Sequence, residues 1–133
     1  FFKKKDKVKI KKFNKANLFY SVLLFPFLKF SEKNSLLKKI SKSLQEDGAL
    51  ICVDKIRSSN SNFEDIFNQL YIDFKIRKKL THKEIIKKAK SLRSSMYLLS
   101  ENQTRTLLKK NGFNNFEIFF KCFNFIGYIA TKQ

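Results

Sequence analysis

The C-terminal third of the sequence constrains the fold more than any other part of the chain. Asn111 and Gly112 end a helical pattern, because both residues tolerate the left-handed conformation in which helices commonly stop. Two β-rich runs follow, residues 116–120 and 121–130, with almost nothing between them. Strands joined by so short a connection run antiparallel. The sequence therefore predicts a sheet that closes with an antiparallel strand pair after its last helix.

A strand–helix–strand unit lies near the start of the chain. Leu18–Phe25 is a continuous apolar run, which is typical of a parallel strand covered on both faces. Ser31 is placed to cap a helix whose apolar positions recur at helical spacing, at Leu36, Leu37, Ile40 and Leu44. Asp47–Gly48 is predicted to form a turn before a second buried strand, Ala49–Val53. A right-handed crossover then places the two strands parallel in one sheet.

Three capping boxes predict the helices that separate this unit from the closing strands. They are Ser61-x-x-Glu64, Thr81-x-x-Glu84 and Ser100-x-x-Gln103. The first of these helices carries an apolar stripe that we expect in the core: Phe63, Ile66, Phe67, Leu70, Tyr71 and Phe74. The resulting order of elements is typical of a doubly wound α/β sheet that finishes with an antiparallel edge strand. Ligands of such sheets bind at the carboxyl ends of the parallel strands, here near residues 23–27 and 54–56.

The chain is strongly basic, with a formal net charge of +18 over 133 residues. Such a charge indicates either a surface that meets a polyanion such as tRNA, or a bias in composition with solvated lysines. Lys greatly outnumbers Arg, and lysines occur in every segment of the chain. These two features favour the interpretation as a composition bias, and the polyanion remains the alternative.

The titratable residues that often build catalytic or metal sites are sparse. Cys52 and Cys122 both fall in predicted strands without CxxC spacing, so we expect two buried, reduced thiols in a cytoplasmic protein. His82 is the only histidine, and no Cys, Asp or Glu cluster accompanies it. We therefore expect a solvated His82 and no metal site.

The longest apolar run, Leu18–Leu28, is interrupted by Ser21 and Pro26 and is shorter than the roughly 20 residues of a membrane-spanning helix. We therefore expect a soluble protein that does not meet a membrane. The chain begins at Phe1 without a recognisable secretory signal, and we interpret it as a fragment or processed product.

Several motifs, taken in order, resemble one enzyme family. Residues 44–50 (Leu-Gln-Glu-Asp-Gly-Ala-Leu) stand where the family has a Leu-x-Pro-Gly-Gly-Ala-Leu turn, and Asp54-Lys55 resembles the acidic-Lys pair that follows. Cys122–Phe125 matches the family's aromatic-Cys-Phe-Asn-Phe ending. On these motifs, residues 16–133 resemble the C-terminal half of class I S-adenosylmethionine-dependent methyltransferases, closest to the carboxy-S-adenosylmethionine synthase branch.

The resemblance implies a fold class and a domain. The fold would be α/β, the C-terminal half of a Rossmann-like methyltransferase sheet with a strand-helix-strand unit, a helical insertion and a closing antiparallel strand pair. Residues 1–133 would form a partial domain without the N-terminal cofactor-binding half, since the only glycines, Gly48, Gly112 and Gly127, provide no glycine-rich loop. The incomplete sheet would expose an apolar edge at Leu18–Phe25, so we expect the chain alone to be inactive.

The resemblance also implies site residues. The cofactor would be S-adenosylmethionine or carboxy-S-adenosylmethionine, bordered by Ser21 and Val22 chiefly through their backbone, with Asp6 as a remnant of the acidic residue near the adenine. Val22 replaces the family's Asn at the end of the fourth strand, and Ala89 replaces an Arg that holds the cofactor's extra carboxylate. On the same helix, Arg93 and Lys90 are the residues we expect to contact a substrate anion. No catalytic residue is identified.

We therefore hypothesise that the chain is the C-terminal portion of a methyltransferase related to carboxy-S-adenosylmethionine synthase. The intact enzyme would act on a small-molecule substrate within the tRNA wobble-uridine modification pathway. A homodimer is a further expectation from the resemblance. The alternatives are a basic, non-enzymatic RNA-binding module and an inactive truncated remnant. The acceptor of the transferred group is not determined by the sequence.

Overall fold

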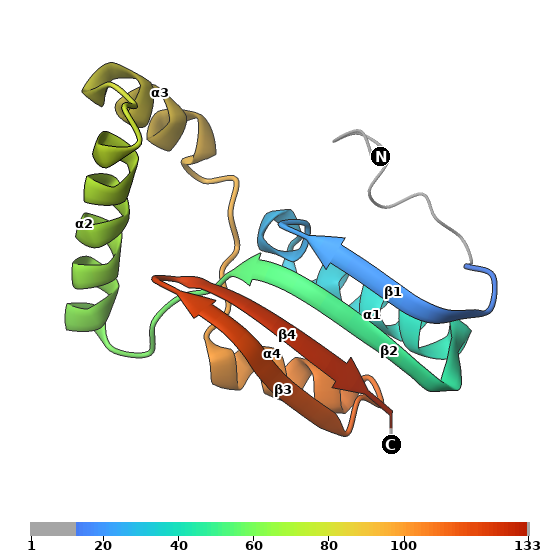
Figure 1. The fold of residues 1–133 in the computed structure, drawn as a ribbon. Helices are drawn as coiled ribbons and strands as arrows, with labels where there is room; N and C mark the ends of the chain where they lie inside the picture. Colours follow the sequence, from blue (N-terminus) through green and yellow to red (C-terminus); the bar gives the residue numbers. More distant parts are fainter. Residues whose placement is uncertain (1–12, 133) are drawn as a thin grey trace.

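The computed structural model describes residues 13–132 and shows an α/β fold (Figure 1). Its strands are β1 (Ala16–Val22), β2 (Leu44–Lys55), β3 (Asn115–Cys122) and β4 (Phe125–Thr131). Its helices are the short 3-10 helix η1 (Phe25–Phe27), α1 (Phe30–Ser43), α2 (Ser61–Arg77), α3 (His82–Leu92) and α4 (Glu101–Lys110). The predicted order of strand, helix, strand, three helices, strand, strand is confirmed.

The four strands form one mixed sheet in the order β1-β2-β4-β3. β1 and β2 run parallel, as the crossover rule predicts, and β4 is antiparallel to both β2 and β3. The expectation of an antiparallel edge strand is wrong in its position, because β4 lies inside the sheet and β3 forms the edge. The more buried strand takes the inner position: Ile126, Tyr128 and Ala130 are buried on β4, whereas only Phe116 is buried on β3.

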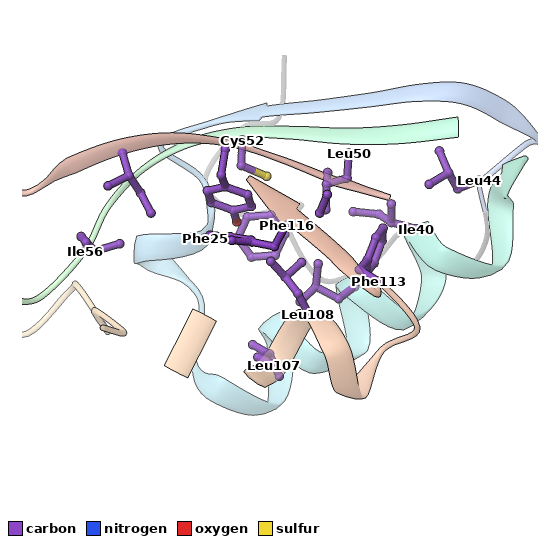
Figure 2. Close-up of a cluster of buried hydrophobic side chains, with 14 of the residues drawn as sticks. Phe25, Ile40, Leu44, Leu50, Cys52, Ile56, Leu107, Leu108, Phe113 and Phe116 are labelled. Carbon is purple, nitrogen blue, oxygen red and sulfur yellow. The ribbon is translucent and has the colours of Figure 1, made fainter. Parts of the chain in front are cut away.

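Helices α1 and α4 cover one face of this sheet, and the core lies between them and the strands (Figures 1 and 2). α1 contributes Leu37 and Ile40 to the core, and α4 contributes Leu107 and Leu108. The strands meet them with alternate residues, since every second side chain of a strand points to the same face. These residues include Leu50, Cys52, Phe116, Ile126, Tyr128 and Ala130.

Two of the three capping boxes are present as predicted. Thr81 caps α3 and Ser100 caps α4, each accepting the backbone N–H of the third helical residue. The cap predicted at Ser61 is displaced by one residue, because Asn60 caps α2. Glu64 accepts the N–H of Ser58 at 2.6 Å instead of that of the cap residue.

The predicted start of α1 is also displaced. The helix begins at Phe30 rather than after Ser31, and Glu32 accepts the N–H of Lys29 at 2.7 Å. An acidic side chain in the first turn satisfies a free N–H group at the helix start, so the hydroxyl of Ser31 is not needed as a cap.

The predicted turn at Asp47–Gly48 is an irregular part of β2. The register between β1 and β2 shifts here, with Ala16 opposite Leu44 and Leu18 opposite Ala49. A Cβ atom at Gly48 would lie 2.6 Å from Leu44 Cδ1 and 2.9 Å from the Asn17 carbonyl oxygen. Close packing, not a turn, therefore requires glycine at this position.

The prediction that the α2 stripe belongs to the core is wrong. α2 has no buried residue, and Phe63 and Phe74 are 55% and 39% exposed. Figure 1 shows α2 and α3 standing away from the sheet. α2 meets the sheet through ring contacts of Tyr71 with Phe123 and Phe125, which join it to the hairpin between β3 and β4.

β1 is likewise not covered on both faces, and it forms an edge of the described sheet. The expectation of an exposed apolar edge is confirmed, because Leu18, Tyr20 and Val22 are each more than half exposed. None of the helices in residues 13–132 combines the length and apolarity needed to cross a lipid bilayer.

Candidate functional site

The carboxyl ends of β1 and β2 meet at one edge of the sheet, where α/β proteins bind their ligands. Val22 lies opposite Val53 in the parallel register, and the N–H of Leu23 donates to the Val53 carbonyl at 2.8 Å. Leu23 has a φ of 53°, in the left-handed region that residues other than glycine rarely adopt. The chain thus leaves β1 through a strained, sharp turn, a feature that is frequent at functional sites.

The structure places the two described cofactor candidates on opposite faces of β1. Ser21 lies opposite the buried Cys52, on the face covered by helices, and its hydroxyl oxygen is shielded from solvent without a hydrogen-bond partner among residues 13–132. Val22 is 63% exposed on the other face. Their side chains therefore do not line a common pocket. The third candidate, Asp6, lies outside the described residues.

The part of the other face formed by Leu18, Tyr20 and Val22 of β1 with Ile51 and Val53 of β2 is apolar, and no described helix packs over it (Figure 1). We call it the open face. Leu18, Tyr20 and Val22 are 51%, 80% and 63% exposed, and their neighbours Ile51 and Val53 on β2 are half-buried. A continuous apolar surface of this kind marks an interaction site or a ligand groove.

A buried polar cluster lies on the opposite face, directly beneath this edge. It combines Lys33 from α1, Cys52 and Asp54 from β2, and Tyr128 from β4, and both Lys33 and Asp54 are less than 5% exposed. The Lys33 ammonium donates to the carbonyl oxygens of Leu28, at 2.6 Å, and Tyr97. Neither carboxylate oxygen of Asp54 has a hydrogen-bond partner of normal geometry among residues 13–132. An adjoining cavity of about 30 Å³ has room for a water molecule.

Burial governs the protonation of this cluster. It raises the pKa of Asp54 to about 7, against the smaller opposing effects of the Lys33 charge, the Phe25 N–H and the Tyr128 hydroxyl. Burial lowers the pKa of Lys33, and Asp54 partly offsets that effect. The pKa values of the Cys52 thiol and the Tyr128 hydroxyl are raised, again chiefly by burial. The cluster therefore contains one carboxyl that exchanges a proton near neutral pH and a thiol that is not a nucleophile.

Sequence reasoning missed Lys33 and gave Asp54 no role. A signal for Lys33 was present, because it continues the apolar stripe of Leu37 and Ile40 one turn towards the start of α1. A lysine on the buried stripe of a helix needs polar partners, and Tyr97 supplies one from a distant part of the chain.

Lys90 and Arg93 do not join the carboxyl edge. Both are exposed on α3, which packs against α2 at a distance from β1 (Figure 1). Arg93 is the C-cap of α3, where the chain starts its return to the sheet. That return is fixed by a hydrogen bond from the Tyr97 N–H to the Pro26 carbonyl at 2.7 Å.

The remaining titratable residues fit a structural interpretation. The prediction of a buried Cys52 is confirmed, but Cys122 is exposed because it ends the edge strand β3 beyond the covering helices; both thiols are free. His82 is exposed at the first position of α3. Residues 13–132 contain no group of His, Cys, Asp and Glu side chains that could hold a metal ion.

The chain resembles curated carboxy-S-adenosyl-L-methionine synthases. It is 35% identical over 121 residues to the enzyme of Staphylococcus epidermidis, an alignment that covers 91% of the chain and 53% of that protein. It is 34% identical over 119 residues to the enzyme of Methylococcus capsulatus, covering 88% and 48%. The chain thus spans about half the length of the curated relatives it matches. No protein-family model matches it.

Solved methyltransferases share the fold. Human N-acetylserotonin methyltransferase in complex with SAM superposes with a TM-score of 0.58 at 12% identity, covering 90% of this chain and 30% of that one. The S-adenosylmethionine-dependent methyltransferase SibL superposes with a TM-score of 0.62 at 5% identity, covering 94% and 33%. The predicted resemblance and fold class are confirmed: the chain is homologous to part of these synthases and has the Rossmann-like α/β fold of part of a methyltransferase.

Proposed function

We propose that the chain is one part of an S-adenosylmethionine-dependent group-transfer enzyme, a methyltransferase-like relative of the carboxy-S-adenosylmethionine synthases, and that a second unit completes its cofactor site. The edge formed by β1 and β2 carries this proposal. Two parallel strands end side by side there, Leu23 turns sharply away, and apolar side chains beside them are exposed. A sheet that lacks its neighbouring strands exposes apolar side chains next to its ligand-binding edge, as β1 does here.

The residues of this chain fit part of a cofactor site. The backbone around Val22 and Leu23 offers polar groups at the strand end, and Val53 offers apolar contact beside them. A glycine-rich loop, which allows close approach of backbone and cofactor, has no counterpart among the three glycines of the sequence. The second unit would therefore supply the loop and the ribose contact, and residues 1–133 would form a partial domain.

The substituted positions favour S-adenosylmethionine over carboxy-S-adenosylmethionine as the cofactor. Bound S-adenosylmethionine supplies an electrophilic methyl group on its sulfonium. Val22 offers no side-chain hydrogen bond to the cofactor, and Ala89 provides no guanidinium for an extra carboxylate. A nearby lysine does not reproduce the bidentate geometry of an arginine. The chain would therefore act by packing and orientation, which carry much of the catalysis in group transfer.

Arg93 is the better proposal for a contact to a substrate anion. It ends α3 and begins the segment that returns to the carboxyl edge, whereas Lys90 lies further back on the exposed surface of the helix. The intact enzyme would act on a small molecule in the cytoplasm, in a pathway that modifies the wobble uridine of tRNA, and would assemble as a homodimer. The homology to carboxy-S-adenosyl-L-methionine synthases supports the small-molecule substrate. The cytoplasm, the tRNA pathway and the homodimer are proposed from the resemblance alone.

The test is reconstitution of the cofactor site. The chain is co-expressed with the part of the Staphylococcus epidermidis synthase that it does not match, and binding of radiolabelled S-adenosylmethionine is measured by equilibrium dialysis. We expect saturable binding for the purified complex and none for the chain alone. The variant Val22→Asp should prevent assembly, whereas Leu70→Asp, the same kind of change on the exposed surface of α2, should not. A stable complex that binds no cofactor would instead support the inactive remnant.

A further inference from the structure

The positive charge of the described chain is concentrated in one segment. Residues 75–93 contain nine basic side chains and one acidic residue, Glu84. The basic residues are Lys75, Arg77, Lys78, Lys79, Lys83, Lys87, Lys88, Lys90 and Arg93. The Glu84 carboxylate accepts both the N–H and the hydroxyl of Thr81 at 2.8 Å, so it serves as a helix cap. The segment therefore has almost no internal counter-charge, in contrast to the even spread of lysines that the sequence suggested.

α3 presents part of this charge as a stripe. Lys83, Lys87 and Lys90 have the i, i+4, i+7 spacing that places side chains on one side of a helix, and all three are exposed. Ile85 and Leu92 lie on the opposite side and are buried and half-buried. The stripe rises by about 10 Å along the helix, since each residue adds roughly 1.5 Å.

A second group of cations surrounds Tyr71. The Lys75 ammonium lies 4.0 Å from the centre of the Tyr71 ring, and the Lys55 ammonium lies 5.9 Å from it. The pKa of Lys75 is lowered, chiefly by burial and further by the positive charges of Lys55 and Lys88. Within residues 13–132, none of the three forms an ion pair with a carboxylate. Crowded cations without counter-ions are stabilised by a bound polyanion.

We propose that the α2–α3 arm, residues 61–93, together with Lys55, binds single-stranded nucleic acid. The lysine stripe and the Tyr71 group would contact consecutive phosphates. Phe63 and Phe74 on α2 are 55% and 39% exposed and would stack on bases, since every base offers an aromatic face.

The lysine stripe of α3 favours nucleic acid over an anionic membrane. A helix that lies on a membrane needs an exposed apolar face beside its cations. On α3 the apolar residue Ile85 is buried, and Ile86 is its one large apolar side chain that is more than half exposed. Large apolar side chains are exposed on α2, so the test includes anionic vesicles. The α2–α3 arm stands apart from β1 (Figure 1), and of the proposed residues only Lys55 lies at the carboxyl end of β2. Binding to the arm therefore does not require a complete cofactor site.

The test uses fluorescence anisotropy with a fluorescein-labelled oligouridylate of about 20 nucleotides, longer than the roughly 4–16 nucleotides of common single-strand sites. Binding of the full chain is measured between about 50 and 200 mM salt. Each phosphate contact contributes about 0.7 to the slope of log K against log salt. Lys83→Gln/Lys87→Gln/Lys90→Gln should therefore reduce the slope by about 2, and Lys55→Gln/Lys88→Gln by about 1.4.

The matched control is Lys38→Gln/Lys42→Gln/Lys109→Gln, which removes the same charge from exposed positions on α1 and α4. We expect this variant to retain the wild-type slope to within about 0.5. Equal losses in both triple variants would overturn the proposal, because they would reflect net charge only. The proposal would also be overturned if the chain did not bind the oligonucleotide. Binding of the chain to phosphatidylserine vesicles but not to the oligonucleotide would overturn it as well.

Discussion

Asp54 is the side chain whose replacement tests the physical account of the site most directly. The residue is 4% exposed, and its carboxyl group lacks a hydrogen-bond partner of normal geometry in the described chain. The pKa of this group is raised to about 7 from an ordinary value of 3.8. A rise of about three pKa units corresponds to a cost of about 4 kcal/mol for holding the charged form in the folded protein. Asp54→Asn removes the charge and retains the shape.

The pH dependence has a definite sign. A carboxyl whose folded pKa is raised binds its proton more tightly in the folded state, so the free energy of unfolding falls as pH rises from about 4 to 7. Above pH 8 the Asp54 carboxyl is ionised in both the folded and the unfolded state, so the folded protein bears the full free-energy cost of the buried charge. The difference in unfolding free energy between Asp54→Asn and the wild type should therefore increase by up to about 4 kcal/mol from pH 4 to pH 8. Water in the adjoining cavity would reduce that value by hydrating the carboxylate.

The assay is urea unfolding followed by far-ultraviolet circular dichroism between about pH 4 and 8, with linear extrapolation to water. Other titrating groups occur in both proteins and cancel in the difference. Asp47→Asn, at an exposed carboxyl, controls for the loss of one negative charge and should stay within about 0.5 kcal/mol across the range. A pH-independent difference for Asp54→Asn would show that this carboxyl does not titrate in the range, and the account of the cluster would be wrong.

Three further predictions test the packing. Asn60→Ala should cost about 1 kcal/mol in urea unfolding because Asn60 caps α2, whereas Ser61→Ala should cost less than about 0.5 kcal/mol; the reverse result would restore Ser61 as the cap. Gly127→Ala should cost about 1–3 kcal/mol, since its Cβ would lie 2.8 Å from the Phe119 ring, and Phe119→Leu should recover part of that loss. Iodoacetamide should alkylate Cys122 in the folded chain and Cys52 only after unfolding, as peptide mass spectrometry would show; equal rates would contradict a closed core.

Local features of the sequence predict the elements well, and the layers less well. Capping at Thr81 and Ser100 depends on neighbours within one helical turn, so sequence alone locates those helix starts. The position of β4 between β2 and β3 depends on long-range pairing with β2, and the more apolar sequence of β4 is the one local sign of its inner position. The burial of Phe63 failed as a prediction because an apolar stripe indicates that a helix has a partner without showing where the partner is.

The polar cluster was even harder to predict from local sequence patterns. Lys33, Asp54 and Tyr128 come from α1, β2 and β4, and only the assembled sheet brings them together. Each residue has an ordinary local explanation: a helix lysine, an acid at a strand end and an aromatic strand residue. The physical constraint that relates them is burial, because a buried ammonium and a buried carboxyl each lose water and attract one another.

The open face and the cluster are linked through β2. Val53 and Asp54 are neighbours in one strand, so their side chains point to opposite faces of the sheet. A unit that covers Val53 removes water from one side of the strand and lowers the local dielectric constant around the other. The neutral form of Asp54 is then favoured further, because loss of water, the largest cause of its raised pKa, outweighs the opposing attraction of the Lys33 ammonium. Binding of the proposed second unit over the open face would therefore displace the titration of Asp54 to higher pH, and the buried carboxyl would report whether that face is covered.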